Sequence, residues 1–112
     1  MTFRRGDVLL VPFPYSDLSA TKVRPAVVVS GAVYHASEPD LILAAITSNV
    51  MAAMGPFDCV LRDWRAAGLR YPSALKPVLF TLDPTQVIHQ VGTLAPADLA
   101  EVDHRLRRAL AL

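Results

Sequence analysis

The chain has 112 residues, fewer than the roughly 150 of an average domain, so we expect residues 1–112 to form one domain around one core. Its 11 Lys and Arg residues and 10 Asp and Glu residues leave a formal net charge of +1. This balance excludes strong attraction to nucleic acid or to a membrane by bulk charge, so any nucleic-acid site must be local. Hydrophobic residues make up 53% of the chain and charged residues 19%. So large an apolar share in a small chain predicts an interface buried between copies of the chain, a homo-oligomer.

No segment is predicted to cross a membrane or to direct secretion. The longest stretch without charge, residues 41–57, is interrupted by three consecutive polar residues and a Gly-Pro pair, well short of the about 20 apolar residues of a transmembrane helix. Near the N-terminus, Asp7 and Pro12 bracket too few apolar residues for a signal peptide. Cys59 is the one cysteine and has no partner for an internal disulfide, so we expect a cytoplasmic protein.

Six short segments rich in Val, Ile, Leu and aromatic residues are bounded by turn residues and predict β-strands. In chain order, these segments are residues 6–13, 25–30, 41–47, 57–61, 75–81 and 86–91. Two stretches, 27–29 and 41–46, are apolar or nearly so throughout, whereas a strand with one solvated face alternates apolar and polar residues. We therefore expect these strands to be buried on both faces.

The last part of the chain combines a turn and a helix. Asp83-Pro84 has the residues of a type I turn, which predicts that the last two strands are adjacent and antiparallel. From Pro96 onward, apolar residues at spacings of three and four predict an amphipathic helix, although Ala95 is a poor N-cap. A shorter helix over residues 63–67 is predicted to end at Gly68. Together these elements predict a mainly β fold, a small curled antiparallel β-barrel with a C-terminal α-helix.

The sequence contains no motif of a metal or nucleotide site. Its three histidines are far apart, and His-x-x-x-His and Cys-x-x-Cys spacings are absent. It also lacks a Gly-x-Ser-x-Gly nucleophile turn and a glycine-rich phosphate loop. We therefore expect a protein that works without a metal ion and without a cofactor.

Arg24 precedes Pro25 at the start of a strand that is predicted to be buried. The proline restricts Arg24 to an extended backbone and so fixes the direction of its guanidinium. A guanidinium held in this way matches two phosphate oxygens and stays charged at every physiological pH. The alternative is that Arg24 pairs with Asp7 or Asp17 and only closes the barrel.

A second candidate is Thr47-Ser48-Asn49, where three small polar residues end the most apolar strand. Their side chains either cap a turn or face the same opening as Arg24. In the second case, the donors of Thr47, Ser48 and Asn49 bind a non-bridging phosphate oxygen.

A third candidate is the polar segment 14–23, which is longer than a tight hairpin needs. At its start, Phe13 and Tyr15 offer stacking surfaces, and near its end Lys22 offers a phosphate contact. This combination is typical of single-stranded nucleic-acid binding. The alternative is that Phe13 belongs to the core and that the loop is merely solvated.

Several motifs follow one another along nearly the whole chain. They are Arg5-Gly6-Asp7-Val8, Arg24-Pro25-Ala26-Val27-Val28-Val29-Ser30, Ala45-Ile46-Thr47-Ser48-Asn49, Pro56-Phe57-Asp58-Cys59-Val60-Leu61, Gln86-Val87-Ile88, Gly92-Thr93-Leu94 and Pro96-x-Asp98-Leu99. In this order and at these distances, they resemble the MazF/PemK-like toxins of bacterial type II toxin-antitoxin systems. The resemblance implies an SH3-like curled barrel that acts as a homodimer.

The resemblance also implies an activity, that of an mRNA interferase. Such toxins are endoribonucleases that cut single-stranded RNA, usually mRNA, at short sequences without a metal, and a cognate antitoxin silences them by occupying the RNA groove. The family's catalytic arginine and strand-end threonine match Arg24 and Thr47, and its aromatic residue at the end of the first strand matches Phe13. The chain departs from some relatives in having Val23 where they have a histidine, and in its loop 15–19, so the cleavage sequence stays open.

For such an enzyme, we expect the RNA 2′-hydroxyl to attack its own adjacent phosphate and to leave a 2′,3′-cyclic phosphate and a 5′-hydroxyl. Arg24 would neutralise the charge that builds on the phosphorane, and Thr47 with Ser48 would hold a non-bridging oxygen. Two alternatives stay open. A toxin of the CcdB kind, which has a similar barrel, would poison DNA gyrase through residues 105–112, and a catalytically silent barrel would only bind a protein partner.

Overall fold

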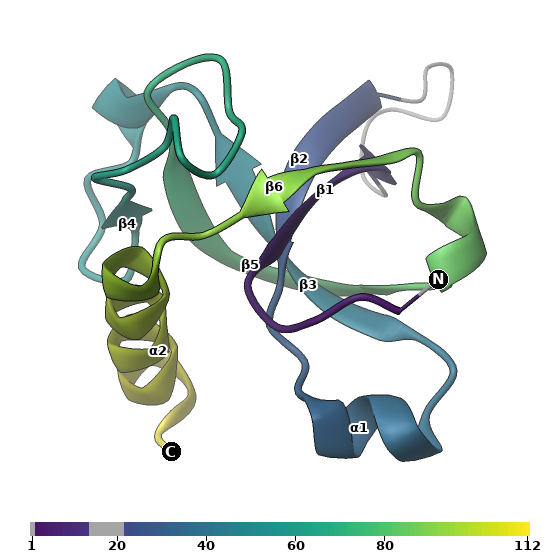
Figure 1. Cartoon of the computed structure of the whole chain (residues 1–112). Coiled ribbons are helices and arrows are strands. Elements are labelled where there is room, and N and C mark those ends of the chain that lie inside the picture. The colour runs from purple at the N-terminus through teal and green to yellow at the C-terminus, as the bar shows by residue number, and fades with distance from the viewer. Residues whose placement is uncertain (1, 14–21) are drawn as a thin grey trace.

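The computed structural model describes residues 2–13 and 22–112, which form a six-stranded antiparallel sheet, two α-helices and two 3-10 turns (Figure 1). The elements are β1 (Asp7–Phe13), β2 (Lys22–Val28), α1 (Ala32–Ser37), β3 (Leu41–Thr47), a 3-10 turn (Val50–Ala52), β4 (Cys59–Val60), β5 (Ala74–Leu82), a 3-10 turn (Pro84–Gln86), β6 (His89–Thr93) and α2 (Pro96–Leu110). The strand order is β4-β5-β3-β2-β1-β6. The prediction of a mainly β, curled antiparallel fold with a C-terminal helix is confirmed.

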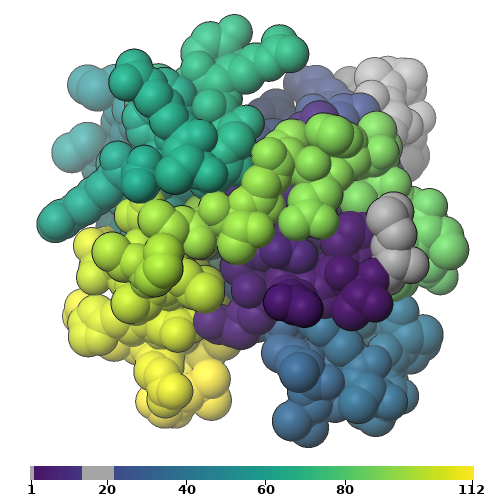
Figure 2. Space-filling view, in the orientation of Figure 1, coloured from purple at the N-terminus to yellow at the C-terminus, as the bar shows by residue number. Residues whose placement is uncertain are grey.

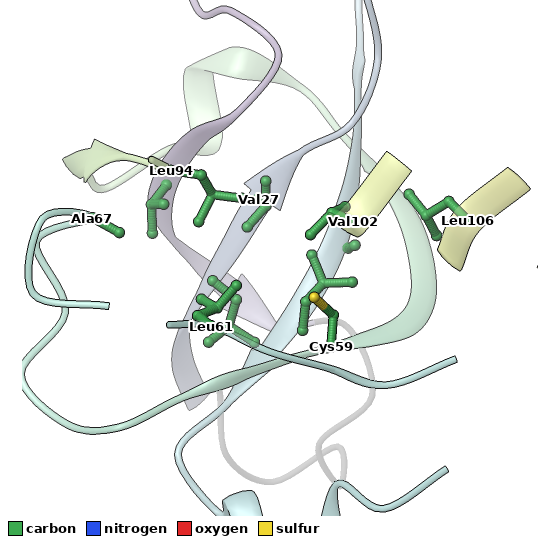
Figure 3. Packing of buried hydrophobic residues seen from close by; sticks show 11 residues of the cluster. Val27, Cys59, Leu61, Ala67, Leu94, Val102 and Leu106 are labelled. Atoms are coloured by element: carbon green, nitrogen blue, oxygen red, sulfur yellow. The ribbon is translucent and has the colours of Figure 1, made fainter. Parts of the chain in front are cut away.

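The central strands are buried on both faces. Val27 and Ala44 belong to a cluster inside the curl of the sheet, which α2 covers (Figure 3). Val28 and Leu43 belong to a second cluster on the opposite face, together with Leu9. All five side chains have no exposed surface. The expectation of burial on both faces is therefore confirmed for the middle of β2 and β3, because alternate residues of a strand point to opposite faces.

Helix α2 begins at Pro96, as the apolar spacing predicts. Its buried side chains Val102 and Leu106 pack onto the sheet above Cys59 and Leu61 (Figure 3). On the outside of the molecule, α2 (yellow-green to yellow) lies beside the first described residues of the chain (purple), as Figure 2 shows. There Arg5 forms an ion pair with Asp103 of α2. No helix in the described ranges is long and apolar enough to cross a membrane.

The prediction that the last two strands are adjacent is wrong. Strand β5 pairs with β3 on one side and with the two residues of β4 on the other, whereas β6 pairs with β1. Asp83 does begin the expected turn, because its carboxylate accepts the backbone N–H of Thr85 at 2.9 Å. The chain then crosses to β1, where the N–H of Ile88 binds the carbonyl of Leu10 at 2.9 Å. The partner of β6 is thus set by the curl of the whole sheet.

The short helix expected over residues 63–67 is also wrong. Residues 62–68 form successive turns, and the N–H of Leu69 binds the carbonyl of Trp64 rather than continuing a helical ladder. The turns end at Gly68, whose φ of +83° is a conformation that glycine adopts without strain. A Cβ atom there would lie 2.0 Å from the Val91 carbonyl of β6. Glycine is therefore required both by the backbone angle and by the close approach of β6.

Helix α1 has no counterpart among the predicted elements. None of its residues is buried, and its N-cap Gly31 supplies no side-chain hydrogen bond. A helix without an apolar stripe gives no periodic signal in the sequence.

Candidate RNA-binding site

Three of the predicted site residues, Phe13, Lys22 and Arg24, lie at one end of the sheet, where β1 ends and β2 begins (Figure 1). Arg24 pairs with Val11 and Lys22 pairs with Phe13, so β2 begins at Lys22, and Lys22 and Val23 belong to this strand and not to the loop 14–23 that the sequence predicts. Directly paired residues of antiparallel strands share a face, and every second residue returns to it. The side chains of Arg24, Lys22 and Phe13 therefore lie on one face of the sheet.

The strand pairing shows which residues of β3 lie on the same face. Ala26 pairs with Ala45, and Thr47 follows Ala45 by two residues, so Thr47 shares the face of Arg24. This is also the face of the second apolar cluster, whose members in β2 are Ala26 and Val28. The polar side chains begin where that cluster ends. The fold thus places Arg24 and Thr47, which are 23 positions apart in the sequence, at the same end of the same surface.

These residues line a hollow of about 370 Å³, which we call the Arg24 hollow. Its walls are Phe13, Lys22, Arg24, Ala45, Ile46, Thr47, Asn49, Ala52, Lys76 and Val78. Five of the seven predicted site residues are among them. Tyr15 lies outside the described residues, and Ser48 lines a different hollow.

Arg24 is exposed, and its guanidinium carbon lies 5.9 Å from the centre of the Phe13 ring. The same ring packs edge-on against Phe80, with 5.5 Å between the centroids. Phe13 is thus both a neighbour of the core and a flat support for the guanidinium, because a cation is attracted to the face of an aromatic ring. Packing of Phe13 on Phe80 fixes the surface against which Arg24 rests.

The alternative in which Arg24 pairs with Asp7 is wrong, and Asp17, the other partner considered, lies outside the described residues. The carboxylate of Asp7 instead accepts the N–H of Arg4 at 2.8 Å and the hydroxyl of Thr93 at 3.1 Å. Within residues 2–13 and 22–112, Arg24 forms no salt bridge. Its charge therefore faces the hollow without a carboxylate from the described part of the chain.

Thr47 has the capping contact that the sequence analysis gave as one possibility. Its Oγ1 atom accepts the backbone N–H of Asn49 at 3.1 Å. A hydroxyl that accepts a hydrogen bond still has its own hydrogen to donate. The turn therefore holds the oxygen in place, and capping a turn is compatible with donating to a ligand in the Arg24 hollow.

A larger hollow, of about 860 Å³, lies on the other side of the start of β2. Ser48 lines it, as do three residues that the sequence analysis did not select: Arg70, Tyr71 and His89. Arg24 and Lys22 line both hollows. The exposed side chains of Arg70 and Tyr71 follow the glycine-ended turn 62–68, and only the folded chain brings them near Arg24.

The described residues contain no other group with the surroundings of a nucleophile or a metal ligand set. Cys59 is fully buried, and burial raises the pKa of its thiol, whereas a reactive cysteine needs a lowered pKa and access to solvent. The Oγ atom of Ser30 lies 2.6 Å from the Nε2 atom of His35, but Ser30 is buried, so its hydroxyl is not open to a substrate. In the described ranges, no three His, Cys, Asp or Glu residues come together as metal ligands do.

Comparison with known proteins decides the family. The model of the PemK-like, MazF-like toxin of type II toxin-antitoxin systems matches residues 4–110 of the chain. The chain belongs to this family. The resemblance carried by the sequence motifs is therefore confirmed, and the protein is a toxin of the MazF/PemK family. A comparison with curated proteins gives no match.

Solved structures share the fold. An endoribonuclease from a mycobacterial species, in complex with its cognate antitoxin, has a TM-score of 0.79 at 17% identity, covering 99% of this chain and 97% of that one. The Mycobacterium tuberculosis toxin MazF-mt6 has a TM-score of 0.75 at 17% identity, covering 95% and 97%. MazF from Deinococcus radiodurans has a TM-score of 0.75 at 24% identity, covering 100% and 99%.

Proposed function

We propose that this MazF-family toxin is an endoribonuclease that cuts single-stranded RNA without a metal ion or cofactor. Its substrate in the cell is mRNA. The observation that carries the proposal is the Arg24 hollow, where Arg24, Thr47 and Phe13 line one surface although they come from three strands. A guanidinium, a hydroxyl and an aromatic ring are the groups that bind a phosphate and an unstacked base. Structural relatives that are named endoribonucleases lend further support.

The chemistry that fits these groups is an intramolecular displacement. The 2′-oxygen of the ribose forms a bond to the adjacent phosphorus while the bond from phosphorus to the 5′-oxygen breaks. The 2′-hydroxyl loses its proton and the leaving 5′-oxygen gains one, so that the products are a 2′,3′-cyclic phosphate and a 5′-hydroxyl. Because the nucleophile belongs to the substrate, the protein has to orient it and stabilise charge, and no activated water is needed.

Arg24 stabilises the negative charge that develops on the phosphorane. A guanidinium keeps its proton in proteins and is a poor general base, so electrostatic stabilisation is the main role of Arg24. Thr47 donates its hydroxyl hydrogen to a non-bridging oxygen. Phe13 stacks on a base, while Lys22 and Asn49 contact the backbone of the bound RNA. Ser48 lines the larger hollow and contacts the RNA on the other side of Arg24.

The gyrase alternative needs residues 105–112 to be available to a partner; residues 107–112 are exposed, but Arg105 is held by contacts within the chain. Its guanidinium binds the carboxylate of Glu101 at 2.9 Å and the carbonyl of Pro56 at 3.4 Å, and it also binds the carbonyl of Asp58. These contacts tie α2 to the segment before β4, which is a structural role.

We also propose three properties of the protein in the cell: that it is one cytoplasmic domain, that it forms a homodimer and that a cognate antitoxin inhibits it. Two of the structures that share its fold are complexes of a toxin with its antitoxin. Large apolar side chains stay exposed on the single chain, among them Val23, Val60 and Ile88, each more than half exposed. An antitoxin segment that competes with RNA has to cover Arg24.

The test compares RNA cleavage by the wild type, Arg24→Ala, Thr47→Val and the control Arg62→Gln. Arg62 is exposed and lines neither hollow. Loss of one preorganised donor typically lowers the rate about 10²- to 10³-fold, so we expect this loss or more for Arg24→Ala and a loss of about this size for Thr47→Val. Arg62→Gln should cut at the wild-type rate. Cleavage by Arg24→Ala at the wild-type rate would remove Arg24 from the mechanism.

A further inference from the structure

Lys76 lines the Arg24 hollow, and neither the motifs nor the strand pattern selects it. The chain has two lysines, Lys22 and Lys76, and both line this hollow. Lys22 faces it from β2 and Lys76 faces it from β5. The hollow therefore has cationic groups on walls that come from different strands.

The register of β5 explains why Lys76 faces the hollow, because Ala74 pairs with Thr47 and Lys76 follows Ala74 by two residues on the same face. Between the pairs of Ala44 with Leu79 and Ile46 with Leu75, strand β3 advances by two residues while β5 advances by four. The extra residues of β5 include Lys76 and are opposed by the single residue Ala45. Such a bulge bends its strand, but two extra residues leave the alternation of the two faces unchanged. Lys76 therefore lies on the same surface as Ala45 and Thr47.

Asp58 holds this ammonium group in place. Its Oδ2 atom lies 3.1 Å from the Nζ atom of Lys76 and also accepts the N–H of Gly55 at 2.9 Å. The side chain of Asp58 is only 5% exposed, whereas that of Lys76 is 35% exposed. A flexible lysine is therefore fixed on one side by a buried carboxylate, and its other side is open.

We propose that Lys76 is a second phosphate-binding residue of the RNA site, and that Asp58 acts through Lys76 as its positioning residue. The proposal rests on the proposed ribonuclease function. An ammonium group has three N–H donors, and Asp58 occupies one of them. The two others have no partner in the described ranges and are available to the oxygens of an RNA phosphate next to the one that Arg24 contacts.

The hollow of about 370 Å³ has the size of a small ligand site. A strand of RNA that carries one phosphate at Arg24 and the next at Lys76 keeps its scissile bond between two fixed cations. Lys76 contributes to binding rather than to the charge that develops in the transition state, because its contact exists in both states. Its loss is therefore expected to raise KM and to leave kcat unchanged.

The substitution has to remove the charge pair without leaving Asp58 buried and unpaired, because an unpaired buried charge destabilises the fold. The double variant Lys76→Met with Asp58→Asn removes both charges and keeps an oxygen that accepts the N–H of Gly55. Lys76→Arg keeps the cation, and Arg62→Gln is the control for loss of one positive charge elsewhere. Thermal unfolding of each variant checks that it is folded.

The experiment measures the binding of a random-sequence RNA oligonucleotide with 2′-O-methyl riboses, which cannot be cut by 2′-hydroxyl attack, over a series of salt concentrations. Each phosphate contact to single-stranded nucleic acid contributes about 0.7 to the slope of log K against log salt. We expect the double variant to lose about 0.7 from this slope and to show a raised KM with unchanged kcat on cleavable RNA. Lys76→Arg should keep the wild-type salt slope and KM, and Arg62→Gln should match the wild type in both.

Two results would overturn the proposal in distinguishable ways. If the wild type binds RNA and the folded double variant has the same salt slope and KM, Lys76 and Asp58 form only a structural ion pair. If the wild type binds no RNA at all, the proposal falls together with the proposed ribonuclease function.

Discussion

The buried carboxylate of Asp98 offers a sharp test of how the fold is held together. Asp98 is the third residue of α2 and is only 3% exposed. Its two oxygens accept the backbone N–H groups of Arg62 and Asp63, each at 2.9 Å. One side chain therefore binds the start of α2 to the start of turns 62–68, and these turns lead to the residues of the larger hollow. The perturbation is Asp98→Ala, which leaves both N–H groups without this acceptor.

The magnitude follows from the two hydrogen bonds. A hydrogen bond to a charged group contributes about 1.5 to 3 kcal/mol, and a carboxylate in the first turn of a helix adds about 0.3 to 1 kcal/mol. Arg62 and Asp63 are exposed, so water replaces part of what is lost. We expect Asp98→Ala to lower the free energy of unfolding by about 2 to 4 kcal/mol, which lowers the Tm of a domain of this size by roughly 10 to 25 °C.

The assay is urea and thermal unfolding of Asp98→Ala beside Asp103→Ala. Asp103 lies on the same helix but forms its ion pair with Arg5 at the surface, where its side chain is 42% exposed. Exposed pairs contribute about 0 to 1 kcal/mol, so Asp103→Ala removes the same type of side chain at much smaller cost. Equal losses in the two variants, or a loss below about 1 kcal/mol for Asp98→Ala, would refute this account of Asp98.

Two further predictions concern turns. Gly68→Ala places a methyl group against the backbone of β6 at a positive φ, so it should destabilise the protein by about 2 kcal/mol or more. In the control Gly31→Ala, nothing lies within 4 Å of the added atom, so the urea midpoint should fall only slightly, by the cost of replacing an N-cap glycine. Equal midpoints for the two variants would refute the close approach. Hydrogen bonds from Thr85 lower the pKa of Asp83, so its ionised form stabilises the native state above the ordinary pKa of an aspartate, about 4, and this contribution is lost as the pH falls through the lowered value. Asp83→Ala should therefore be less stable than the wild type at pH 7, with the difference shrinking in acid, and a difference that is independent of pH would contradict this role.

The local features of the fold are predictable because they depend on neighbouring residues. Apolar segments between turn residues identify all six strands to within about three residues at each end, and Pro96 marks the start of α2. Strand β4 is shorter than its apolar segment. The partner of β6 is not predictable in this way, because it depends on which strand edge remains free after the sheet has curled. Helix α1 is not predictable either, because it buries nothing.

The candidate site, like the fold, has some features that the sequence predicts and others that it does not. Arg24 stands out in the sequence because a proline fixes its backbone, and Thr47 stands out because it ends an apolar strand. That the two line one hollow follows from the register of β1, β2 and β3, which pairs residues far apart in the chain. Lys76 also precedes a proline, Pro77, so the rule that selects Arg24 applies to it as well. Its place in the hollow depends on the pairing of β5 with β3 and on Asp58, which lies 18 positions away.

The most direct test of the central claim is an analysis of RNA ends. Purified protein is incubated in EDTA with a long single-stranded RNA, beside Arg24→Ala, and the ends of the fragments are identified by mass spectrometry. We expect fragments with 2′,3′-cyclic phosphates and 5′-hydroxyls from the wild type and intact RNA from the variant. Intact RNA from a folded wild-type protein, fragments with 5′-phosphates, or equal cutting by Arg24→Ala would contradict the account.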